Sequence, residues 1–198
     1  MDAAPSFSPL SSQPFLLILK TGDTHERLRA AQGDFEHWIE RGLRAGESPS
    51  AHVPLVVLDP RRGDRLPEPA QLAGVVISGS HAMVSDREAW SERSAEWLAG
   101  VVRAQVAEGA VALAGNAFEP HQAFRAGGAR AWGVQFHPEF DEAAMRGYID
   151  EVAAASPRGA AIAADAQVRP TPHSARLLAR FAQLVGQGVA PAPAPCAA

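Results

Sequence analysis

Three short apolar runs constrain the fold of this chain more than any other feature. They cover residues 15–19, 53–58 and 74–78, and polar residues hardly interrupt them. Continuous apolar runs of this length are typical of parallel strands that are buried on both faces. Pro54 lies near the start of the second run, where a strand tolerates a residue without an N–H group. The runs therefore predict parallel strands that are neighbours at the centre of a sheet.

Apolar residues at helical spacing follow these predicted strands. Asp34 is expected to cap a helix that buries Phe35, Trp38, Ile39 and Leu43. Another helix is expected over residues 90–105, and Asp141 and Ser174 are the expected caps of two later helices. Because strands and amphipathic helices alternate, the sequence predicts an α/β fold, a three-layer and mostly parallel sheet with flanking helices.

A hairpin is expected in the second half of the chain. Residues 110–113 are a candidate for a fourth strand, and residues 122–125 and 131–136 flank Gly127-Gly128. Two glycines between short strand-like segments are a hairpin signal, because glycine adopts the positive φ angles that tight turns require.

Length and composition limit the possible functions. The 198 residues suffice for one domain, which we expect at residues 14–188, between a disordered N-terminus at 1–13 and a disordered Pro/Ala-rich tail at 189–198. The net charge is −4 without a long basic stretch, so no nucleic-acid partner is expected. We find no signal peptide and no membrane-spanning run, and we expect no membrane partner and a cytoplasmic location. Neither a cofactor nor a metal is expected, because the seven histidines and one cysteine show no ligand spacing.

One string carries recognisable chemistry. Residues 132–140 read Trp-Gly-Val-Gln-Phe-His-Pro-Glu-Phe, an alternating apolar segment that turns polar at Pro138. His137 and Glu139 are therefore expected at a strand end, two residues apart, where both side chains can share one face. A histidine beside a carboxylate is a pairing that deprotonates a nucleophile, with the carboxylate orienting the base.

Two segments resemble the class I glutamine amidotransferases, and are most similar to the stand-alone type related to the glutaminase domain of GMP synthase. Residues 74–90 resemble that family's third strand and the turn after it, and residues 132–140 resemble its histidine–glutamate motif. The resemblance implies a flavodoxin-like sheet and a reaction that hydrolyses the side-chain amide of glutamine to supply ammonia. It implies that His137 is the base, that Glu139 orients it, and that Gly79 and Ser80 form the oxyanion and substrate turn.

The sequence departs from this family at the nucleophile. The family's cysteine stands in a Gly-x-Cys-x-Gly elbow after the fourth strand, and no such string occurs here. The elbow and its neighbouring elements are missing as one block, with the seam expected near residues 106–111. The only cysteine, Cys196, lies in the tail, where nothing positions a base or lowers its pKa. We therefore expect an internally truncated, inactive member of the family, with glutamine as its ancestral substrate.

Two other hypotheses remain open. The chain could be a non-catalytic binding or regulatory module that docks on a synthetase, or a hydrolase that uses a serine such as Ser80.

A deletion from the core also predicts marginal stability or self-association, through faces left uncovered near Leu98, Val102 and Phe124.

Overall fold

The computed structural model describes residues 13–45, 53–103, 110–117, 120–126, 131–155 and 158–188. Nearly all of the expected N-terminal disorder, the whole Pro/Ala tail and Cys196 lie outside these ranges. So do Gly127-Gly128 and most of the expected seam, of which only residues 110 and 111 are described.

The first sheet is parallel, as the sequence predicts. It contains β1 (Phe15–Leu19), β2 (Leu55–Leu58) and β3 (Leu72–Ile77) in the order β2-β1-β3. β2 begins two residues later than predicted, although the Pro54 carbonyl still accepts a hydrogen bond from the Leu16 N–H at 2.8 Å. β3 begins two residues earlier and ends one residue earlier than predicted. The prediction that the three strands are adjacent and parallel is confirmed.

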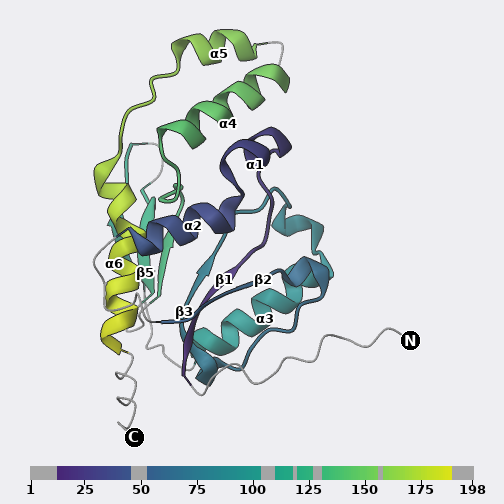
Figure 1. The fold of residues 1–198 in the computed structure, drawn as a ribbon, viewed down its shortest axis with the longest axis vertical. Helices are drawn as coiled ribbons and strands as arrows, with labels where there is room; N and C mark the ends of the chain where they lie inside the picture. The colour runs from purple at the N-terminus through teal and green to yellow at the C-terminus, as the bar shows by residue number, and fades with distance from the viewer. Residues whose placement is uncertain are drawn as a thin grey trace, which may run out of the picture.

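Helices cover both faces of this sheet, and β1 is therefore buried on both sides. Leu16 and Ile18 pack against α2 (Phe35–Arg44) and α6 (Pro172–Gly188). Leu17 and Leu19 face the other way, toward Trp97 of α3 (Ala89–Arg103). Figure 1 shows α2 and α6 on one side of β1 and α3 on the other. The α/β class and the layering around the parallel sheet are confirmed.

A second sheet is antiparallel and separate from the first. It joins β4 (Ala110–Ala114), β5 (Ala123–Ala126) and β6 (Trp132–Val134) in the order β4-β5-β6. The hairpin between β5 and β6 is confirmed. The expectation of one mostly parallel sheet is not met, because β4 pairs with β5 and the described strands divide equally between two sheets.

The remaining helices agree with the sequence only in part. Asp141 caps α4 (Glu142–Ala155) as predicted, with its Oδ1 accepting from the Ala144 N–H at 2.8 Å. Ser174 is not a cap, because α6 begins at Pro172, whose fixed φ suits a first helical position. The sequence did not predict α1 (Glu26–Gln32) or α5 (Gly159–Asp165). Short 3₁₀ turns occupy Pro60–Arg62, Pro69–Gln71 and Val84–Asp86.

Candidate functional site

The candidate site lies at the carboxyl edge of the parallel sheet, where the turn after β3 is fixed by the loop after β1. The Thr21 N–H donates to Oγ of Ser78 at 2.9 Å, and the Thr21 hydroxyl donates to the Ser78 carbonyl at 2.6 Å. Gly22 lies directly against the next peptide, since a Cβ atom there would sit 2.6 Å from the carbonyl oxygen of Gly79. Only glycine permits this approach, and the turn is therefore held from one side by the loop after β1.

His137 and Glu139 form the pair that their spacing suggested. His137 Nδ1 lies 2.8 Å from Glu139 Oε1. The Glu139 side chain is 7% exposed, whereas that of His137 is 47% exposed. The buried carboxylate thus fixes one ring nitrogen and leaves Nε2 as the other polar atom of a half-exposed imidazole.

The local structure that brings His137 and Glu139 together differs from the expected strand end. The sequence predicted His137 at the end of a strand. β6 instead ends at Val134, so His137 does not directly follow a strand. A turn brings the pair together instead, and the Phe140 N–H donates to the His137 carbonyl at 3.3 Å. The Phe140 ring also stacks on the imidazole, with centroids 4.3 Å apart and an interplanar angle of 23°. The carboxylate and the stacked ring together set the plane of the imidazole.

The structure brings this imidazole to the turn after β3. A Cβ atom on Gly79 would lie 3.4 Å from Cε1 of His137, the carbon between the two ring nitrogens. His137, Glu139 and Gly79 therefore come together, as their positions in the sequence predicted. Ser80 follows in the same turn, but its hydroxyl accepts from the Ala82 N–H at 3.1 Å.

A nucleophile is not found in the described part of the chain. Within it, no serine or threonine hydroxyl forms a hydrogen bond with His137, and the only cysteine is Cys196, outside the described ranges. Ser78 is engaged by Thr21. The geometry can orient a base, but it shows no group for that base to deprotonate.

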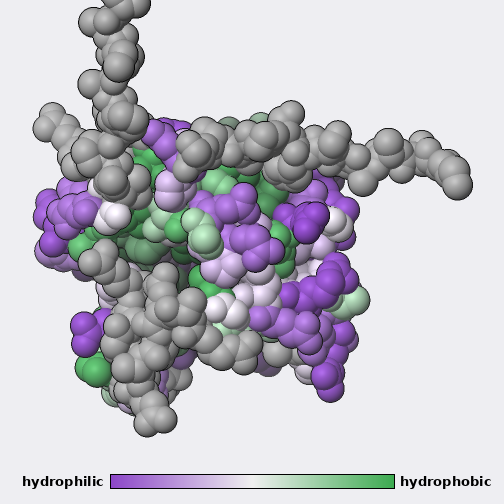
Figure 2. Space-filling view, turned by 90° about the horizontal axis from the view of Figure 1, so that it is seen from below, coloured by the Kyte–Doolittle hydropathy of each residue, from purple (hydrophilic) through white to green (hydrophobic). Residues whose placement is uncertain are grey.

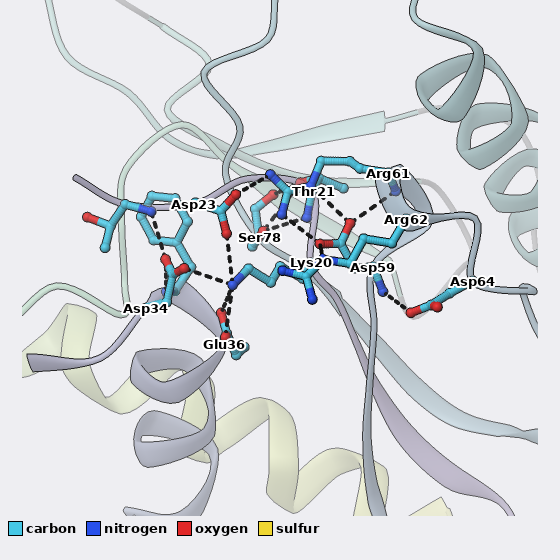
Figure 3. Close-up of polar contacts among 12 residues, drawn as sticks. Lys20, Thr21, Asp23, Asp34, Glu36, Asp59, Arg61, Arg62, Asp64 and Ser78 are labelled. Carbon is cyan, nitrogen blue, oxygen red and sulfur yellow. Dashed lines mark hydrogen bonds and ion pairs between the residues drawn. The ribbon is translucent and has the colours of Figure 1, made fainter. Parts of the chain in front are cut away.

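Sequence reasoning missed a buried charge network beside this turn (Figure 3). Lys20 follows β1, and its ammonium group lies 2.8 Å from Asp34, 2.8 Å from Glu36 and 3.0 Å from Asp23. Burial alone would lower the pKa of Lys20, but the hydrogen bonds to these carboxylates outweigh burial and raise it. The only sequence signal was a lysine directly after a fully apolar strand.

Arg61 extends the network to the end of β2. It pairs with both Asp23 and Asp59, and it holds the pKa of Asp23 well below its usual value. Burial would raise the pKa of Asp59, but hydrogen bonds from Arg61 lower it. Figure 3 shows each of these cations enclosed by carboxylates. We therefore assign the network to stability rather than to ligand binding.

Beyond His137, the described residues form a hollow on α2, but neither a metal-holding group of His, Cys, Asp and Glu side chains nor a membrane-spanning helix. A hollow on α2 is lined by His37, Glu40, Arg41 and Arg44, and His137 is not among its lining residues. Among the described residues, no group of three or more His, Cys, Asp or Glu side chains is arranged to hold a metal ion. Within the described residues, no helix has the length and apolarity that crossing a membrane requires.

Comparison with known proteins gives no match: no family model, no curated protein and no solved structure is significantly similar to the chain. The parallel sheet with helices on both faces is compatible with a flavodoxin-like fold.

Proposed function

We propose that this protein is a class I glutamine amidotransferase-like domain that lacks glutaminase activity because its nucleophile segment has been lost. One observation carries the proposal. The imidazole of His137, oriented by buried Glu139, lies against Gly79 in a chain whose only cysteine is Cys196. This arrangement fits the roles that the sequence motif implies for the three residues.

The chemistry explains why such a site is silent. In the family reaction a thiolate attacks the amide carbon of glutamine, the histidine takes the thiol proton, and backbone N–H groups stabilise the oxyanion. His137 can act as the base and the Gly79 N–H as an oxyanion donor, but neither forms the covalent intermediate. Loss of the nucleophile from a catalytic triad lowers turnover by about a millionfold.

An ammonia-release assay on the purified protein tests this proposal. We expect no glutamine hydrolysis above the rate without protein, and no change for Cys196→Ala or His137→Ala. Turnover that disappears in His137→Ala would show that another group serves as nucleophile. Ser80→Ala would then test the nearest hydroxyl in the turn. The coding DNA across residues 106–111 provides an independent check, because an intact Gly-x-Cys-x-Gly elbow there would contradict the deletion.

A specific observation favours the second candidate, a non-catalytic docking module. Large apolar side chains on the antiparallel sheet are 40–55% exposed: Val111, Leu113, Phe124, Trp132 and Val134. Figure 2 also shows hydrophobic residues on the face seen from below. Exposed apolar groups of this kind mark interaction surfaces. Pull-down with the full chain tests this function, and capture of a synthetase that Phe124→Ser abolishes would support it.

A further inference from the structure

Two histidines and a tyrosine from three separate segments meet beside the turn after β3. His25 precedes α1, His81 follows Ser80, and Tyr148 lies on α4. The ring centroids of His25 and His81 are 5.5 Å apart, and those of His25 and Tyr148 are 5.1 Å apart. We propose that these three side chains form a binding site for a divalent transition-metal ion such as Zn²⁺, with the two imidazoles as its principal ligands.

The distances fit a shared ion. Zn–N bonds of about 2.0–2.1 Å place the centres of two imidazoles on one tetrahedral ion about 5 Å apart. The His25–His81 separation of 5.5 Å is close to this value. Tyr148 Oη lies 3.5 Å from His81 Nε2. This is longer than a good hydrogen bond, but it is near the separation of about 3.3 Å between two donor atoms on the same ion.

The imidazole nitrogens are free to bind a metal. Within the described part of the chain, no side chain or backbone group hydrogen-bonds the His25 ring, and the only hydrogen-bond partner of the His81 ring is the distant Tyr148 hydroxyl. His25 and Tyr148 are half-buried and His81 is exposed. Solvent can therefore reach the site at the exposed ring of His81.

This site is distinct from the His137–Glu139 pair, because Nδ1 of His137 is already occupied by Glu139. The two are nevertheless neighbours, since Phe140 contacts both His137 and Tyr148, with centroids 4.3 and 5.0 Å apart. A bound ion would connect the turn after β3 to α1 and α4. The proposal does not depend on glutaminase ancestry, because it rests only on these three side chains.

Zn²⁺ titration by calorimetry tests the site, with Cys196→Ser as the starting protein so that the tail thiol cannot bind metal. We expect one ion per chain, and a loss of affinity of at least about tenfold in His25→Gln and in His81→Gln. Tyr148→Phe should have a smaller effect. His173→Gln, which removes an exposed imidazole from α6, is the matched control and should bind normally. Circular dichroism of each variant reports whether it folds, and His81→Gln is the safest because His81 is exposed.

Co²⁺ gives a second readout, because its visible absorption reports the coordination geometry. A four- or five-coordinate spectrum that is lost in His81→Gln would support the site. Absence of Zn²⁺ binding would overturn the proposal, as would binding that both His25→Gln and His81→Gln retain. Binding that is lost in His137→Gln but kept in His81→Gln would assign the metal to the other pair and would also overturn it.

Discussion

Replacing Lys20 by Met should destabilise the protein by about 3 kcal/mol, because it removes the cation from a buried cluster while keeping the side-chain volume. Loss of one partner of a buried ion pair costs about 3–5 kcal/mol. The structure favours the lower end of this range. Asp34 keeps two backbone N–H donors at 2.7 and 2.9 Å, and Asp23 is 34% exposed and keeps an arginine partner. The main loss falls on Glu36, whose side chain is 17% exposed.

Urea unfolding followed by circular dichroism measures this effect at pH 7, with a lower midpoint and an unchanged slope as the expected result. Arg44→Met is the matched control, because it breaks the exposed Glu40–Arg44 pair and should cost less than about 1 kcal/mol. Glu36→Gln should destabilise the wild type but recover part of the loss in Lys20→Met, since it removes the unpaired charge. Equal losses for Lys20→Met and Arg44→Met would refute the assignment of the cluster to stability.

Three further predictions concern the neighbouring regions. The depressed pKa of Asp23 stabilises the fold above its unfolded value near 3.8, and this contribution is lost as the pH falls below that value. Asp23→Asn should therefore flatten the stability profile between pH 5 and pH 2.5, and an unchanged profile would contradict the Arg61 pairing. Gly22→Ala should lower stability by about 1–3 kcal/mol, because its Cβ meets the Gly79 carbonyl, and a neutral result in urea unfolding would count against the close approach. The chain should self-associate in sedimentation experiments, and Phe124→Ser should reduce the association; a monomer at all concentrations would argue against a large deletion from the core.

The expected surfaces for this association are only partly observed. Phe124 is 40% exposed, as its predicted role requires, but Leu98 is half-buried. The side chain of Val102 lies outside the described residues. Within the described part of the chain, β3 pairs only with β1, so its other edge is unpaired and Ile77 is 41% exposed. The open edge is a better candidate for association than the face of α3.

Strong local signals made part of this fold predictable. The run at Phe15–Leu19 is apolar at every position because β1 is buried on both faces, and such a run fits few other structures. Asp34 was a reliable cap because its carboxylate has a local partner in the Phe35 N–H. In contrast, α1 buries only Leu28, so it has no apolar stripe to reveal it.

The residues of the candidate site were predictable, but the turn and the charge cluster that surround them were not. The spacing of His137 and Glu139 correctly predicted a pair, although a turn rather than a strand end forms it. The cluster at Lys20 was not predictable, because its carboxylates come from α2 and from a separate loop. No local pattern shows that α2 begins beside the end of β1, since tertiary packing decides that position.

The orientation of the His137 imidazole does not depend on a nucleophile. Glu139 fixes the imidazole through a hydrogen bond, and Phe140 fixes its plane by stacking. Phe140 is in turn buried against Trp38 and Phe35, far along the chain. None of these contacts involves a thiol, so loss of a cysteine segment would leave them intact. A well-formed histidine–glutamate pair is therefore what we expect in a silent site, and a glutamine-turnover measurement distinguishes it from an active one.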